Sequence, residues 1–189
     1  MLFRSNDTAT TEIYTDYYTL SLHDALPIWP PGTLRIGLSW RGGTPGTRAS
    51  ERSIPLRDLA ACVAGPGREL VSLQYGDTRA EVEGVNAELG CSVRWFPREE
   101  LDDFEAFAGL VQSLDVVVSV QNTTVHTAGA VGAPCLALLP RVPEWRYMAE
   151  GEAMPWYRSV RLLRQPERGD WAPVLAQVAG ELAFQSPLS

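Results

Sequence analysis

The sequence contains no lysine, and it has few cysteines and histidines. The Walker pattern G-x-x-x-x-G-K-[ST], which needs a lysine, is therefore absent, and no G-x-G-x-x-G follows a predicted strand. Cys62, Cys91 and Cys135 are odd in number, far apart and set among apolar neighbours. This spacing predicts buried free thiols in a reducing compartment, the cytoplasm, rather than disulfides or a metal site.

Histidine scarcity and charge exclude further classes of site. His126 is the one histidine after residue 28, and no cysteine pair accompanies it, so no zinc site and no metal cofactor are expected. Sixteen basic residues, all arginine, stand against 23 acidic ones, a net charge of −7 that argues against a nucleic-acid partner. No apolar run reaches the roughly 18 residues of a membrane span, so none is predicted.

The first 28 residues carry neither helical nor strand periodicity and do not form a targeting signal. Leu2–Ser5 and Ala25–Ile28 can be encoded by the same short DNA word in two reading frames. The stretch therefore resembles the conceptual translation of a sequencing adapter. We expect residues 1–28 to be a non-native, disordered leader, the alternative being a disordered natural one. Residues 29–189 are then expected to form one domain at the C-terminal end of a longer protein.

Within residues 29–189, short apolar runs alternate with amphipathic segments, which predicts an α/β fold: a Rossmann-like parallel sheet with helices on both faces. The predicted strands are Leu34–Leu38, Leu70–Gln74, Val93–Phe96, Asp115–Val120, Pro134–Pro140 and Val160–Leu163. The predicted helices are Leu56–Ala64, Thr78–Leu89, a third capped by Asp102 or Asp103 and running to Ser113, Thr123–Val131 and Trp171–Phe184. In the third helix, the helical spacing of Phe104, Phe107, Leu110, Val111 and Leu114 predicts a core-facing stripe.

Two candidate sites follow strands, where ligands collect at the carboxyl edge of a parallel sheet. The loop from Ser39 to Arg52 is rich in glycine, and its Arg41, Arg48 and Arg52 offer forked donors to phosphate oxygens. The alternative is a solvated loop. The second candidate, SVQNTTVHTAGAVGAP at 119–134, places hydroxyl and amide side chains at the start of a helix.

The start of that helix favours an anion, because its backbone N–H groups are unpaired, and His126 in the first turn can add a hydrogen bond or a positive charge. The alternative is that Asn122 or Thr123 only caps the helix and His126 is bonded in the interior. The aromatic residues of the segment 141–164 also allow two interpretations, one functional and one structural. Trp145, Tyr147, Trp156 and Tyr157 would either stack on a sugar or base, or clamp the loop onto the core.

The stretch VVVSVQNTTVHTAGAVGAPCLALLP resembles the C-terminal sugar-nucleotide motif of glycosyltransferase family 9, the heptosyltransferase-like group. Three further stretches, GLSWRGGTPGTRASERSIPL, LVSLQYGD and VPEWRYMAEGEAMPWYRSVRLLRQPERGDW, resemble the C-terminal domains of bacterial tetratricopeptide-repeat proteins that carry such a module. The resemblance implies the C-terminal half of a GT-B glycosyltransferase, with the N-terminal acceptor domain missing.

The resemblance also implies roles for particular residues. A nucleotide-sugar donor would bind its diphosphate at residues of the two strand-to-helix loops, namely Gln121, Asn122, Thr123, Thr124, His126, Arg41, Gly42, Gly43 and Thr44. Gln74 and Tyr75 would contact the base or ribose. The implied reaction is inverting transfer, without metal, to an unknown acceptor.

The sequence departs from the family at two positions of the motif. Gln121 stands where the family has Asp, and Thr123 where it has Gly. No general base is assigned, since Asp102, Asp103 and Glu144 are candidates by type only. The alternative function is therefore an inactive transferase-like domain that binds a nucleotide or a protein, and the isolated chain is expected to transfer no sugar.

Overall fold

The computed structural model describes residues 32–97 and 102–184. The chain divides into two units, Met1–Pro30 and Pro31–Ser189, and the predicted leader lies in the first, outside the described residues. No helix in the described ranges is long and apolar enough to cross a membrane, the longest being the 12-residue α7 (Ala172–Ala183).

The described part is built on one six-stranded sheet in which all neighbouring strands are parallel. Its strands are β1 (Leu34–Ser39), β2 (Arg68–Ser72), β3 (Val93–Arg94), β4 (Val116–Val120), β5 (Cys135–Leu139) and β6 (Val160–Arg164). They follow the order β3-β2-β1-β4-β5-β6. The direction of winding reverses between β1 and β4, and a crevice opens at the carboxyl ends of such a pair.

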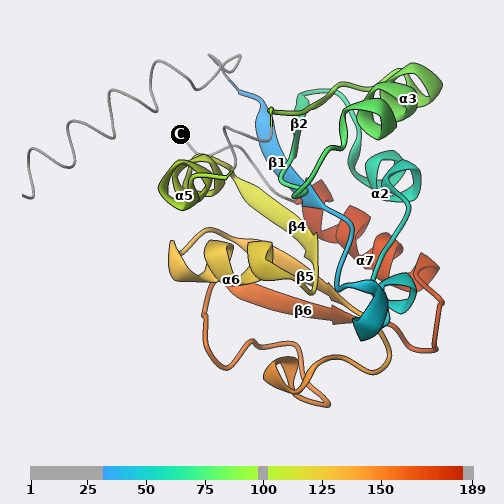
Figure 1. Cartoon of the computed structure of the whole chain (residues 1–189), viewed down its shortest axis with the longest axis vertical. Helices are drawn as coiled ribbons and strands as arrows, with labels where there is room; N and C mark the ends of the chain where they lie inside the picture. Colours follow the sequence, from blue (N-terminus) through green and yellow to red (C-terminus); the bar gives the residue numbers. More distant parts are fainter. Residues whose placement is uncertain (1–31, 98–101, 185–189) are drawn as a thin grey trace, which may run out of the picture. The chain divides into compact units, whose positions relative to one another are not determined.

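Helices cover both faces of the sheet, as Figure 1 shows. One face carries α2 (Leu56–Val63), α3 (Arg79–Leu89) and α7, and the other carries α5 (Phe104–Gln112) and α6 (Thr123–Ala130). The sequence-based prediction of a Rossmann-like α/β fold is therefore confirmed.

The core lies against both faces of the central strands. Every residue of β4 is buried, as expected for a strand covered on two sides. Gly37 in β1 shows how closely the α5 side approaches, because a Cβ there would lie 2.6 Å from methyl groups of Leu73 and Leu114. On the opposite face, Ile36 and Leu38 belong to the apolar cluster that α2 and α7 complete.

The boundaries differ from the prediction at a few places. β2 runs from Arg68 to Ser72, two residues earlier at each end than predicted. Leu73 N–H still bonds to Leu38 O, whereas the side chain of Gln74 bonds to the backbone after β1. Of the predicted third strand, the pair Val93–Arg94 is in the ladder. Short 3-10 turns lie in segments predicted as loop: η1 (Pro45–Thr47), η2 (Ala49–Glu51) and η3 (Trp145–Tyr147).

The predicted stripe on α5 is core in its second half alone. Leu110, Val111 and the following Leu114 are buried, whereas Phe104 is 62% exposed and Phe107 is half-buried. The prediction was wrong for Phe104, which lies in the first turn of α5. The thiol prediction is confirmed in part: the three cysteines are free, but only Cys135 is fully buried, while Cys62 and Cys91 are half-buried.

Candidate functional site

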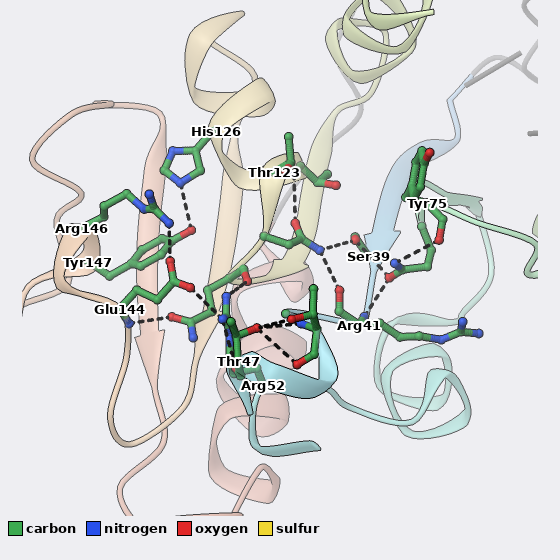
Figure 2. Close-up of a pocket in the computed structure, with 16 residues that line it drawn as sticks. Ser39, Arg41, Thr47, Arg52, Tyr75, Thr123, His126, Glu144, Arg146 and Tyr147 are labelled. Atoms are coloured by element: carbon green, nitrogen blue, oxygen red, sulfur yellow. Dashed lines mark hydrogen bonds and ion pairs between the residues drawn. The ribbon is translucent and has the colours of Figure 1, made fainter. Parts of the chain in front are cut away.

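A cleft of about 620 Å³ lies at the carboxyl ends of β1 and β4, where the winding of the sheet reverses. It brings together the sequence-predicted residues Arg41, Gly43, Thr44, Gln74, Tyr75, Gln121, Asn122, Thr123, Thr124 and His126. The cleft also contains Ser39, Thr47, Glu144, Arg146 and Tyr147 and the predicted phosphate donor Arg52, which come from two segments, one at the end of β1 and one after β5 (Figure 2).

Gln74 fixes the start of the loop after β1. Its side-chain oxygen accepts hydrogen bonds from the backbone N–H groups of Trp40 at 2.9 Å and Arg41 at 2.7 Å, and from the hydroxyl of Ser39 at 3.3 Å. The Gln74 side chain therefore organises this loop from a largely buried position, 7% exposed. Tyr75 is different, since 63% of it is exposed at the cleft wall.

The two glycines of this loop have separate roles. Gly42 is buried beneath the cleft, where a Cβ would lie 2.9 Å from Arg52 O and 3.0 Å from Gln121 O. The close approach that Gly42 permits is thus between protein backbones. Gly43 is at the cleft wall with φ of 76°, a left-handed conformation that favours glycine.

Asn122 caps α6 and joins the two loops of the cleft. Its Oδ1 accepts from Thr124 N–H at 3.0 Å, and its Nδ2 donates to Ser39 Oγ at 2.7 Å and to Arg41 O at 3.1 Å. Asn122 therefore caps α6, as one interpretation held, and it also lines the cleft. The cap leaves Thr123 exposed at the mouth of the cleft.

His126 lies at the cleft wall between two tyrosines of the segment after β5. Its Nε2 is 3.3 Å from the hydroxyl of Tyr147, and its ring centroid is 5.8 Å from that of Tyr147 and 5.9 Å from that of Tyr157. Burial, and then the positive charge of Arg146, lower the pKa of His126 below 6.5. The lowered pKa favours the neutral imidazole, so of the two predicted contributions, a hydrogen bond or a positive charge, it favours the hydrogen bond.

Arg52 supplies the most buried positive charge of the cleft, with a side chain 10% exposed. Its Nη2 donates to Gln121 O at 3.1 Å, and its Nη1 lies 2.7 Å from Glu144 Oε1. Among the residues that the structure describes, its Nε finds no hydrogen-bond partner although it is buried. The Arg52 guanidinium thus has one buried donor without a partner among the described residues.

The other predicted arginines are placed differently. Arg41 lines the cleft but its guanidinium turns to Glu81 on α3. Arg48 pairs with Glu51 at 3.8 Å and is not part of the cleft lining among the described residues. Arg146, which the prediction did not single out, pairs with Glu144 beside His126 (Figure 2).

Sequence reasoning left open whether the segment 141–147 belongs to the site: it singled out the aromatic residues and Glu144 but not Arg146, and the structure places the segment at the cleft. Arg164 holds it in place by donating to the backbone carbonyls of Tyr147, Met148, Glu150 and Gly151. Tyr147 is buried there, while Trp145 is 74% and Trp156 54% exposed. Tyrosines therefore clamp the segment, as one alternative predicted, and the tryptophans lie at the surface. One signal in the sequence could have placed this segment at the site. It follows β5, the neighbour of β4 in the sheet, and so begins at the same edge of the sheet as the cleft.

A second hollow of about 540 Å³ adjoins the cleft and shares Tyr75, Thr123 and Thr124 with it. Its other wall is formed by Leu73, Phe104 and Phe107, with Asp102 at the edge. The exposed Phe104 of α5 is thus part of a concave, largely apolar surface.

The three carboxylates considered as general bases have other contacts. Asp103 caps α5 by accepting from Glu105 N–H at 2.8 Å. Burial raises the pKa of Glu144, but the hydrogen bond from Arg146 and the charge of Arg52 outweigh it, so the net pKa is lowered. Across residues 32–97 and 102–184, no group of three or more His, Cys, Asp or Glu could hold a metal ion.

No family model matches the chain. Protein FlbA of Caulobacter vibrioides (strain ATCC 19089 / CIP 103742 / CB 15) is 32% identical over 151 residues, which cover 78% of this chain and 25% of FlbA. The chain thus spans about a quarter of the length of that curated relative.

Solved structures with the same fold are glycosyltransferases. E. coli heptosyltransferase WaaC, solved with ADP-2-deoxy-2-fluoro heptose, matches with a TM-score of 0.59 at 15% identity, over 86% of this chain and 47% of WaaC. E. coli ADP-heptose lps heptosyltransferase II matches with a TM-score of 0.59 at 16% identity, over 97% of this chain and 53% of that chain. A glycosyl transferase family 9 protein of Veillonella parvula DSM 2008 matches with a TM-score of 0.56 at 10% identity, over 100% of this chain and 46% of that chain. The chain therefore has a glycosyltransferase-like α/β fold and spans about half of each of these chains.

Proposed function

We propose that this chain is the donor-binding domain of a glycosyltransferase that transfers a sugar from a nucleotide donor with inversion and without a metal. The observation that carries the proposal is the cleft at the β1–β4 switch, where Arg52 and Arg146 meet His126 and the start of α6. Support comes from the fold, which the chain shares with glycosyltransferases, one of them solved with an ADP-sugar analogue.

The diphosphate of the donor would lie against Arg52, Arg146 and the exposed Thr123. In the reaction, the bond between the anomeric carbon and the β-phosphate oxygen breaks, and a bond from the acceptor oxygen to that carbon forms on the opposite face. The electron pair goes to the leaving diphosphate, where guanidinium N–H groups and the N-terminal end of α6 stabilise it. The acceptor's proton goes to a general base.

The base of the nucleotide would occupy the second hollow. Tyr75 and Phe104 are both more than half exposed and border this hollow, so they offer aromatic faces to a planar ring. Thr123 and Thr124 border both cavities, which makes the two spaces continuous along the start of α6. A ligand with an aromatic end and a multiply charged end fits this pair of cavities.

The general base is proposed to come from a domain outside this chain. Glu144 is engaged by two arginines and its pKa is lowered, so it is a weak proton acceptor. An N-terminal acceptor domain, accompanied by tetratricopeptide repeats, would supply the base and bind the acceptor. The proposal places this protein in the cytoplasm, where nucleotide sugars are made.

A second function is favoured by Gln121. Its side chain is buried, and its oxygen accepts from Glu144 N–H at 3.1 Å, so residue 121 supplies an amide that fixes the segment 141–147, in place of the carboxylate of the family motif. Such a cleft is compatible with a domain that binds a nucleotide or a protein partner and catalyses no reaction. Binding of a nucleoside diphosphate without any turnover in the full-length protein would favour it.

The test is calorimetric titration of the full chain with ADP, UDP and GDP. Arg146→Gln should weaken binding of the preferred nucleotide about tenfold, since a hydrogen bond to a charged group contributes about 1.5–3 kcal/mol. The matched control is Arg57→Gln, which removes an arginine that pairs with Glu88 on the exposed surface of α2 and α3. Equal affinities for both variants and the unaltered chain would place the nucleotide elsewhere.

A further inference from the structure

The carboxylate of Glu144 lies between the two guanidinium groups that the proposed diphosphate would need. Its Oε1 is 2.7 Å from Nη1 of Arg52, and its Oε2 pairs with Nη2 of Arg146. Both arginines and Glu144 line the same cleft, beside His126 (Figure 2). The anionic position of the cleft is therefore occupied by a group of the protein itself.

This occupation is incomplete in one respect. The buried Nε of Arg52 has no hydrogen-bond partner in the described part of the chain, although the Nη atoms of Arg52 are bonded to Thr47 O, Gln121 O and Glu144. A single carboxylate offers two oxygens, and each is already directed at a different arginine. A diphosphate carries more oxygens and more charge than one carboxylate, so it can bond to both guanidinium groups with several oxygens each.

The carboxylate of Glu144 can move away from the two arginines while the backbone around it keeps its hydrogen bonds. The backbone of residue 144 is held independently of its carboxylate, because its N–H donates to Gln121 Oε1 at 3.1 Å. The following residues are held by Arg164 through backbone carbonyls. The Glu144 side chain is 30% exposed, so it can rotate toward solvent while the segment keeps its position.

We propose that Glu144 is an internal competitor for the diphosphate, which sets the affinity of the cleft by holding Arg52 and Arg146 until a more highly charged ligand displaces it. This inference rests on the proposed function, since it presupposes that a phosphate ligand binds between these arginines. It assigns Glu144 the role of an affinity-setting residue in place of the general base considered from the sequence.

Titration of the full chain with inorganic pyrophosphate tests the inference. Glu144→Gln removes the charge and keeps the shape of the side chain, and it should bind pyrophosphate about tenfold more tightly than the unaltered chain, because binding no longer requires charged hydrogen bonds to be broken. Glu88→Gln makes the same charge change at an exposed pair with Arg57, away from the cleft. This control should leave the affinity unchanged.

A second variant, Glu144→Ala, guards against an effect of the new amide, and it should shift the affinity in the same direction. Equal or weaker binding by both Glu144 variants, with the unaltered chain binding pyrophosphate, would overturn the inference and leave the proposed function standing. Absence of binding by the unaltered chain and by both variants, to pyrophosphate and to nucleoside diphosphates alike, would overturn the proposed function and this inference together.

Discussion

At the scale of single residues, the cleft depends on side chains whose partners are other parts of the protein. Asn122 and Gln74 were predicted from the sequence to contact a ligand; both line the cleft, and both also bond to neighbouring loops. Arg52 differs from them. It belongs to a loop, yet its side chain is buried, and its Nε has no hydrogen-bond partner among the described residues. Local sequence shows that such residues are polar and follow strands, but the partner of each is fixed by tertiary packing.

His126 gives a prediction on pH dependence. Its folded pKa lies below 6.5, so between the two values the unfolded chain binds more protons than the folded one. The stability contributed by neutral His126 is therefore present at higher pH and lost as pH falls below about 6.5. Thermal unfolding between about pH 8 and about pH 5 should show a smaller loss of stability for His126→Gln than for the unaltered chain.

The carboxylates and the other histidine are common to the two proteins in this comparison, so the difference between the curves reports His126 alone. Parallel curves over that range would show that the imidazole has the same pKa in the folded and unfolded chains. That result would contradict the burial of His126 between Tyr147 and Tyr157.

At the scale of elements, the strands and helices were predictable because each carries its own periodicity and its own ends. β4 was read from a continuous apolar run, and α6 from a polar cap followed by small residues. The segment 141–157 was not predictable in the same way. It has no period, and its place at the cleft depends on Arg164 of β6, which donates to its carbonyls from beyond the end of the segment.

The contact between α6 and this segment can be tested at Gly129. A Cβ at this position would lie 2.2 Å from Cγ of Tyr157, which requires the aromatic ring to move. Gly129→Ala should therefore destabilise the protein by about 1–3 kcal/mol, as overpacking does. Chemical denaturation measures the change in the free energy of unfolding.

The matched control is Gly180→Ala in α7. Gly180 is exposed and a Cβ there would meet nothing within 4 Å, so alanine should stabilise the helix by up to about 1 kcal/mol. If Gly129→Ala were as stable as Gly180→Ala, Tyr157 would not be packed against α6 as described.

At the scale of the whole molecule, the fold class was predictable and the activity is not. The alternation of strands and helices specifies a parallel sheet, and the order β3-β2-β1-β4-β5-β6 places a crevice between β1 and β4. The chain spans about half of the solved glycosyltransferases of the same fold and a quarter of FlbA, and the proposed function assigns the general base to a domain outside it.

The chain by itself is accordingly predicted to bind a donor nucleotide and to transfer no sugar. The physical reason is that the chain spans about half of the solved glycosyltransferases of the same fold, and that two of the candidate carboxylates in the described part are engaged: Asp103 caps α5, and Glu144 pairs with Arg52 and Arg146. Release of nucleoside diphosphate from nucleotide sugars, measured with and without added sugar acceptors, checks this. Acceptor-dependent release by the isolated chain would show that a general base lies within it.

The most direct measurement of the central claim is a crystal structure of the chain with the nucleoside diphosphate that it binds most tightly. Phosphate oxygens should lie within hydrogen-bond distance of Arg52 and Arg146, next to the start of α6, with the carboxylate of Glu144 turned away from both arginines. A diphosphate bound elsewhere, with Glu144 still paired to Arg52 and Arg146, would contradict it.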